Sequence, residues 1–326
     1  MPESEFDYNL HRLLATQNSP NLRNTALLYC QRSVTFRGLF AQTERCAKAL
    51  CRWGVRPEME IPIPWAATPE VFYLILALWK LGAVPRLGKR CPAAFAPPIA
   101  FAHADQCPAP DEVPPSTPTV LLSPTLSMPL LARRRYTERG KSNPSLRHIL
   151  WKDFLSSGDS IPKAPQAVAP PQQKALRCCP PNSPAQSATA SDLFALLQLR
   201  CETSCKTWQR KDTFSHLSTV ETPSNLVDAL LLPLCLGLCL HLEPFPTDHL
   251  FTEILLGNRL RHLIAPADLW RSCTQQKEGQ LYDFSCLQSA LICGKDSPLS
   301  PEEEAAIQGT LAAGQSPAVL TTLHGL

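Results

Sequence analysis

The amino-acid sequence predicts an α/β fold built from layered sheets and helices. Helical segments alternate along the chain with short apolar segments of strand length, which is the pattern of α/β layers. With 326 residues, the chain is long enough for two or three subdomains with their own cores. A hydrophobic fraction of 44% and a charged fraction of 18% are typical of a globular protein with a packed interior.

Two helices near the N-terminus have clear start and stop signals. The first begins after Thr35, a good N-cap residue, and runs through Trp53. The second begins after Thr68 and ends at Gly82, with a proline in its first turn, where a missing N–H is tolerated. Its body, residues 71–81, is apolar nearly all round, so we expect it to be buried on most sides.

A short apolar segment between these helices, residues 60–64, predicts a strand with weakened pairing. Pro62 and Pro64 each lack the N–H that a sheet ladder uses, so the strand should pair on one edge only or poorly. Residues 86–147 are irregular, and three prolines within 91–98 argue against a helix there.

The composition divides the chain into three parts. Residues 1–158 predict a first α/β subdomain, and residues 191–326 predict a second. Between them, residues 159–190 are rich in Pro, Ala, Gln and Ser, which is the composition of a loop or linker. Near the end, the capping box that begins at Ser300 predicts a helix that stops at Gly314.

The longest apolar run, Leu226 to Leu240, predicts a buried helix followed by a strand. It is 15 residues long and contains Asp228 and Pro233, so it falls short of the ~20 residues that a membrane span needs. The acidic, polar N-terminus does not resemble a signal peptide, so we expect a cytoplasmic protein. A net charge of +3 is too small to indicate nucleic acid or an anionic membrane as a partner.

The 14 cysteines favour buried free thiols over a disulfide framework or a metal site. No C-x-x-C motif occurs, and the close pairs are Cys178–Cys179, Cys201–Cys205 and Cys235–Cys239. A structural zinc site usually needs two suitably spaced pairs of ligands, and we identify none. Most of these cysteines replace small apolar residues in periodic segments.

Motifs in three blocks of the chain resemble one protein family. Residues 24–85 read NTALLYCQRSVTFRGLF, then KALCRWGV, then TPEVFYLILALWKLGAVP, and residues 148–158 contain WKDFL. This series resembles the start of the acyl-adenylate-forming, or AMP-binding, ligases, which include the fatty-acid and acyl-CoA synthetases. The pattern is legible again over 211–326. The resemblance implies the large N-terminal domain of an adenylate-forming enzyme, incomplete and lacking the small C-terminal domain.

The resemblance also implies ATP and CoA as cofactors and a fatty or other carboxylic acid as substrate. The family holds ATP phosphates on a loop rich in Gly, Thr and Ser that also contains a lysine. The matching stretch here, residues 178–191, has neither glycine nor lysine, and no glycine occurs from Asp159 through Leu236. The hydroxyls of Ser183, Ser187 and Thr189 could contact a phosphate, but a Ser/Thr-rich linker is the simpler interpretation.

The family's acyl pocket is also altered in this sequence. The corresponding residues, 220–225, lack the family's aromatic residue and glycine. Glu221 is expected to place a charge where an acyl chain would lie, which costs several kcal/mol unless the carboxylate is paired or neutralised.

Four residues match the family's adenine-binding segments. Gly294 and Asp296 fit a loop of the type GG(A/D)xLSPE, although such a segment would be a strand-to-helix turn in any case. His324 and Gly325 stand where the family has the start of GYGxTE. No catalytic residue is identified, and no G-x-S-x-G, H-E-x-x-H or G-x-G-x-x-G motif occurs.

The sequence therefore predicts an inactive or fragmentary relative of an acyl-CoA synthetase, an AMP-forming acid–thiol ligase. One alternative is an active ligase with non-standard phosphate contacts or separately encoded parts. Another is a non-catalytic protein-interaction module, in which a protein partner covers the exposed sheet edges.

Overall fold

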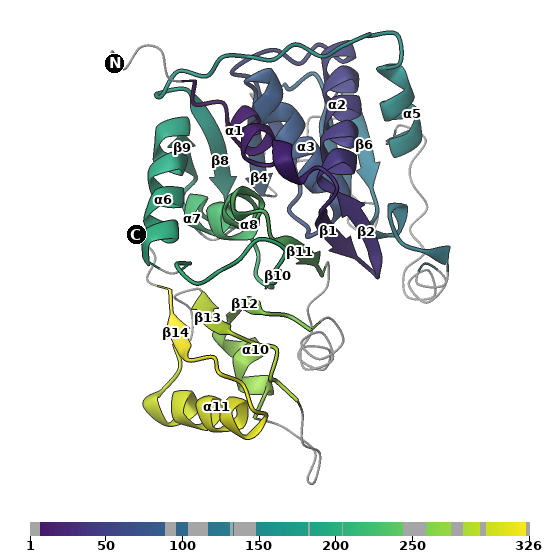
Figure 1. Cartoon of the computed structure of the whole chain (residues 1–326). Helices are drawn as coiled ribbons and strands as arrows, with labels where there is room; N and C mark the ends of the chain where they lie inside the picture. The colour runs from purple at the N-terminus through teal and green to yellow at the C-terminus, as the bar shows by residue number, and fades with distance from the viewer. Residues whose placement is uncertain are drawn as a thin grey trace.

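The structure is a computed structural model of the whole chain, shown in Figure 1. It describes residues 7–88, 96–103, 117–130, 133, 148–181, 183–203, 205–243, 259–274, 283–293 and 298–323. Sheets and helices are layered, as the sequence predicts, and strands β12 to β14 with helices α10 and α11 form a lobe at the bottom of Figure 1.

The largest sheet combines strands from both ends of the chain, in the order β14-β13-β12-β10-β11-β1-β2. Neighbouring strands are parallel except for the hairpin formed by β1 and β2. The strands are β1 (Thr25–Tyr29), β2 (Arg32–Thr35), β10 (Thr213–His216), β11 (Cys239–Leu242), β12 (His262–Pro266), β13 (Ser289–Cys293) and β14 (Leu320–Thr322). The opening hairpin of the predicted first subdomain therefore completes the sheet of the predicted second one.

Two smaller sheets have the orders β3-β4-β8-β9 and β5-β6-β7. Their strands are β3 (Glu60–Ile63), β4 (Val84–Gly88), β8 (Lys174–Cys179), β9 (Gln186–Thr189), β5 (Ala100–His103), β6 (Thr119–Leu122) and β7 (His148–Leu150). Strand β3 lies next to β5 but, among the described residues, pairs only with β4. The predicted one-sided pairing is confirmed, because Pro62 lies within β3 and cannot donate to a ladder.

The helices follow the predicted signals closely. They are α1 (Leu10–Gln17), α2 (Phe36–Arg52), α3 (Pro69–Leu81), α5 (Trp151–Ser157), α6 (Ala190–Thr203), α7 (Pro223–Leu226), α8 (Leu232–Leu236), α10 (Ala267–Ser272) and α11 (Pro301–Ala313). The Thr35 side chain accepts a hydrogen bond from the Gly38 N–H at the start of α2. Every residue of α3 is buried, and the helix packs against α1, α2 and β4.

The apolar run is a buried helix and strand, as predicted. A π-helical turn over Val227–Leu231 joins α7 to α8, next to Pro233, which cannot supply an N–H to the helical ladder. Gly237 ends α8 in the left-handed conformation, and β11 follows. No described helix is long and apolar enough to cross a membrane.

The segment predicted to be a linker, residues 159–190, contains two strands instead. Strand β8 pairs with β4 on one side and with β9 on the other, so it lies inside a sheet. Leu176 and Cys178 are completely buried in the main hydrophobic core. The proline-rich composition hides these strands because β8 pairs with β4, about 90 residues earlier in the chain, and β9 pairs in turn with β8.

Candidate functional site

The described carboxyl ends of several strands surround one region, where open α/β sheets usually bind ligands. The turn after β8 lies near α7, which contacts both β8 and β9. The loop after β10 leads into α7 and reaches the end of β13, where Ser218 hydrogen-bonds to Cys293. This region, called the carboxyl edge below, is formed by the described residues of the turn after β8 (180, 181 and 183–185), the loop 217–222 and the ends of β10 and β13.

The turn between β8 and β9 occupies the position that the resemblance assigns to a phosphate loop. Cys178 pairs with Gln186, so residues 180–185 connect two antiparallel strands. Phosphate-binding loops use backbone N–H groups as donors, and glycine lets the chain approach the phosphate closely. Three of the six turn residues are prolines without an N–H, and none is Gly or Lys. This turn is poor in the donors that a phosphate needs.

The three hydroxyls considered for phosphate contact lie in different surroundings. The Asp192 N–H donates to Thr189 Oγ1 over 3.2 Å, and the Thr189 N–H donates to Asp192 Oδ2 over 2.8 Å. Thr189 therefore caps the N-terminus of α6. Ser183 and Ser187 are exposed.

Neutral side chains occupy the ends of β10 and β13. His216 is buried, and burial lowers its pKa to about 4, so its imidazole is neutral near pH 7. Ser218 Oγ lies 3.3 Å from His216 Nε2. Burial raises the pKa of Cys293 to about 11, which keeps it a thiol rather than the reactive thiolate. These groups can exchange hydrogen bonds but cannot neutralise phosphate charge.

A buried arginine near the carboxyl edge forms an ion pair with a carboxylate. Arg200 of α6 donates to both oxygens of Asp228, over 2.9 and 3.2 Å, and to Ser224 Oγ over 2.9 Å. Sequence reasoning missed this pair. The signal available was Asp228 itself, because a carboxylate in a buried apolar run requires a partner.

Glu221 does not intrude into a buried acyl pocket. Its side chain is exposed, and its Oε1 accepts a hydrogen bond of 3.3 Å from Thr219 Oγ1. The expectation of a desolvated charge at this position is wrong, because the loop 217–222 turns the carboxylate to solvent.

The four adenine-side residues, Gly294, Asp296, His324 and Gly325, lie outside the described residues. The strands that precede them are paired, since the Leu323 N–H donates to the Ile292 carbonyl over 2.9 Å. Their assignment to an adenine site stays a prediction.

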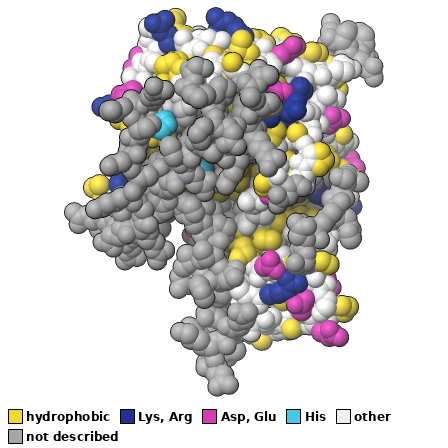
Figure 2. Space-filling model, turned by 180° about the vertical axis from the view of Figure 1, so that it is seen from behind, with side chains coloured by type: hydrophobic (Ala, Val, Ile, Leu, Met, Phe, Trp, Pro, Cys, Tyr) yellow, Lys and Arg dark blue, Asp and Glu magenta, His cyan; other side chains and the backbone are white. Residues whose placement is uncertain are grey.

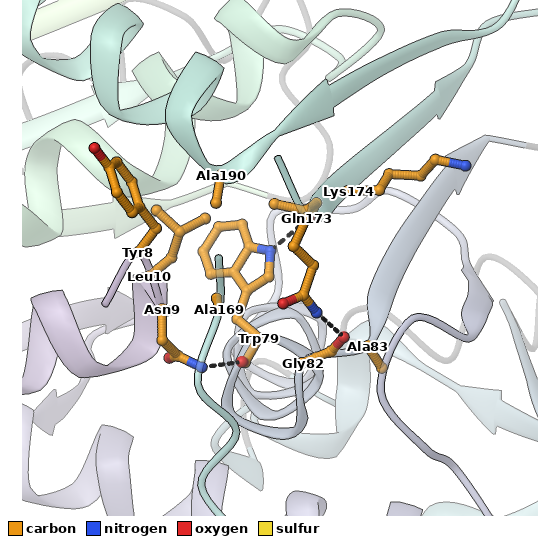
Figure 3. Close-up of a pocket in the computed structure, with 11 residues that line it drawn as sticks. Tyr8, Asn9, Leu10, Trp79, Gly82, Ala83, Ala169, Gln173, Lys174 and Ala190 are labelled. Atoms are coloured by element: carbon orange, nitrogen blue, oxygen red, sulfur yellow. Dashed lines mark hydrogen bonds between the residues drawn. The ribbon is translucent and has the colours of Figure 1, made fainter. Parts of the chain in front are cut away.

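A small pocket of about 20 Å³ lies at the other end of β8 (Figure 3). The Asn9 Nδ2 donates to the Trp79 carbonyl over 2.8 Å, and the Gln173 Nε2 donates to the Gly82 carbonyl over 2.7 Å. The Trp79 Nε1 donates to the Ala175 carbonyl over 2.7 Å. A space of this size holds about one water molecule. The three hydrogen bonds that line it connect the start of α1, helix α3 and the start of β8.

The described cysteines and charged residues add no obvious reactive centre. The 12 cysteines within the described ranges are all free thiols. No group of three or more His, Cys, Asp or Glu in that part of the chain could hold a metal ion. On the face in Figure 2, the visible basic side chains are interspersed with acidic ones. In the C-terminal lobe, for example, the Arg271 Nε donates to Glu303 Oε1 over 2.8 Å.

Comparison with solved structures identifies the fold. An anthranilate CoA ligase, AuaEII, in complex with anthranoyl-AMP, matches 98% of this chain with a TM-score of 0.77 and 14% identity. A benzoate CoA ligase from Burkholderia xenovorans LB400 matches 98% with a TM-score of 0.73 and 16% identity. The fold is that of the acyl-CoA and aryl-CoA ligases.

The N-terminal domain of FACL13 from Mycobacterium tuberculosis also matches, over 97% of this chain, with a TM-score of 0.68 and 13% identity. The predicted AMP-binding fold is therefore confirmed. This chain spans 60% and 61% of the lengths of the anthranilate and benzoate ligases, and 76% of the FACL13 domain. No protein-family model and no curated protein matches the sequence.

Proposed function

We propose that this chain is a non-adenylating relative of the acyl-CoA ligases. The observation that carries the proposal is the turn between β8 and β9. By the sequence resemblance it corresponds to the family's phosphate loop, but it contains no glycine or lysine. Adenylation of a carboxylic acid requires donors and cations that hold the β- and γ-phosphates while the α-phosphate is attacked. The prolines of the turn remove three backbone donors, and Arg200 is engaged by Asp228.

ATP, CoA and a carboxylic acid remain the ligands that the fold suggests. We propose the loss of adenylation and not the loss of ligand binding. The carboxyl edge could therefore still hold a nucleotide or a carboxylic acid. The protein would then act as a binding protein rather than as an AMP-forming ligase.

Pyrophosphate release tests the proposal directly. The full chain is incubated with ATP, Mg²⁺ and a panel of aliphatic and aromatic carboxylic acids, and an active CoA ligase serves as the positive control. We expect release at the no-protein background for every acid. Acid-dependent turnover above that background contradicts the proposal and supports an active ligase with non-standard phosphate contacts.

An interaction module is the second candidate, and the free edge of β14 favours it. Among the described residues, β14 pairs only with β13, and Val319 beside it is 69% exposed. Gln308 partly protects this edge, because its Oε1 accepts the Leu320 N–H over 2.8 Å. A partner strand could pair at the remaining positions.

A proline variant tests strand addition at this edge. The Leu323 N–H points toward β13, so alternation along the strand places the Thr322 N–H on the open side. Thr322→Pro should abolish a stoichiometric complex with a partner and leave the pairing with β13 in place. A complex that survives this substitution does not form through β14.

A further inference from the structure

We propose that the small sheet carries a binding site for a phosphate dianion, formed by Arg86, Lys174 and Arg177 around Glu60. These four residues, called the basic cluster below, come from β4, β8 and β3. The inference is independent of the proposed function, because the cluster lies on the strands and not in the turn after β8.

Among the described residues, the Glu60 carboxylate contacts all three cations of the basic cluster. Glu60 Oε2 accepts from the Arg86 Nη1 over 3.0 Å. Glu60 Oε1 accepts from the Lys174 Nζ over 3.0 Å and lies 3.4 Å from the Arg177 Nη1. Partial burial raises the pKa of Glu60, but the hydrogen bonds from Lys174 and Arg86 and the Arg177 charge lower it by more. The four side chains carry three positive charges and one negative charge.

Arg177 is the least satisfied member of the cluster. Its contact with Glu60 is long for a charge-assisted hydrogen bond, which is usually about 2.7 to 2.9 Å. Its Nε is buried and has no acceptor. A guanidinium has five N–H donors in a planar fork, and the contact with Glu60 uses only Nη1. A buried donor without an acceptor is unfavourable, so the Arg177 guanidinium lacks a full set of hydrogen bonds in this structure.

The basic cluster is open to a ligand from solvent. The Lys174 side chain is 42% exposed and the Arg177 side chain is 31% exposed. Arg177 is in register with Arg86 on β4 and with Ser187 on β9, so the three side chains share one face of the sheet. Ser187 is exposed and adds a hydroxyl donor beside the guanidinium.

An anion with at least three acceptor oxygens, such as a phosphate, fits these features better than a carboxylate. The cations of the cluster outnumber its one carboxylate, and the planar fork of Arg177 matches two phosphate oxygens. The Lys174 ammonium and the Ser187 hydroxyl can reach a third oxygen from either side of Arg177, along β8 and across to β9.

Titration of the full chain with inorganic phosphate tests the site. Calorimetry is run at low ionic strength, with sodium chloride at matched ionic strength as the control anion. We expect saturable binding of one phosphate, weakened about tenfold or more by Arg177→Gln and less strongly by Lys174→Gln. Lys152→Gln, an exposed lysine on α5, is the matched control and should bind like the unmodified chain.

Two results overturn the inference: no saturable binding at millimolar phosphate, or equal affinity in Arg177→Gln and in the unmodified chain. Circular dichroism checks that each variant is folded. If Arg177→Gln does not fold, thermal melting replaces the titration. Phosphate must then raise the Tm of the unmodified chain above that in matched chloride, and Lys174→Gln must reduce that rise. Failure of either condition equally rejects the site, whereas pyrophosphate release bears only on the proposed function.

Discussion

Buried histidines make the stability of this protein sensitive to acid. His11, His216 and His241 are buried, and desolvation lowers the pKa of each to about 4. For His11 the charge of Lys80 adds to this effect. Each imidazole is neutral in the folded chain at a pH at which the unfolded chain is protonated, since an unperturbed histidine has a pKa near 6.5.

Stability should therefore fall as the pH drops from about 6.5 toward 4. The unfolded chain binds more protons in that window, so each histidine lowers the free energy of unfolding by up to about 1.4 kcal/mol per pH unit. Urea unfolding at about pH 7.5, 6 and 5 measures the slope. The variant His241→Leu removes one titrating group and should show a shallower slope. An unchanged slope in this variant would contradict the assignment.

The buried ion pair of Arg200 and Asp228 provides a second prediction at the residue scale. Burial raises the pKa of Asp228, and the charge of Arg200 opposes that rise. Asp228→Ala leaves the guanidinium buried without its carboxylate and should destabilise the fold by about 3 to 5 kcal/mol. The double variant Arg200→Met with Asp228→Leu should recover most of that loss. A single variant within about 1 kcal/mol of the unmodified chain in urea unfolding would show that water reaches the pair.

At the scale of elements, the end of β4 depends on a glycine. Gly88 has φ +120°, and a Cβ there would lie 2.1 Å from the carbonyl oxygen of Cys179 on β8. Gly88→Ala should therefore disrupt the β4–β8 pairing and cost more than about 3 kcal/mol. Gly54→Ala is the matched control, because Gly54 also has a positive φ but a Cβ added there would meet no atom within 4 Å.

The control should cost about 1 to 2 kcal/mol, the penalty of a left-handed conformation alone. Thermal or urea unfolding of both variants measures the difference. Equal destabilisation would mean that β4 and β8 can separate locally without loss of stability.

The helices and the strands differ in how far the sequence predicts them. The ends of α2, α3 and α11 lie within one residue of the predicted bounds, because Thr35, Gly82 and the Ser300 capping box act locally. The composition predicts a linker where β8 and β9 lie, because prolines on both sides mask two short strands. Local signals suffice for a capped helix, whereas a short strand depends on its neighbours in the sheet.

At the scale of the whole molecule, the first strand stabilises the second half of the chain. Leu27 of β1 is completely buried and lies opposite Leu240 of β11. Leu27→Ala should cost about 2 to 5 kcal/mol and speed amide hydrogen exchange in β11, more than 200 residues away in sequence.

Leu150→Ala is the matched control for this coupling. Leu150 lies in β7 and is 56% exposed, so its truncation should leave both the stability and the exchange in β11 nearly unchanged. Unaltered exchange in β11 after Leu27→Ala would show that the sheet tolerates loss of its contact with β1.

The α/β class, the capped helices, the one-sided pairing at Pro62 and the lack of glycine and lysine in the turn after β8 all follow from the amino-acid sequence. Each depends on residue type and on short-range geometry, so neighbouring residues are enough to predict it. The folded chain was needed to find that β1 joins β11, that Arg200 meets Asp228, and that Glu60 gathers Arg86, Lys174 and Arg177. Such contacts join residues that can be more than 200 positions apart, and sheet pairing and burial, rather than local propensity, select which of them meet.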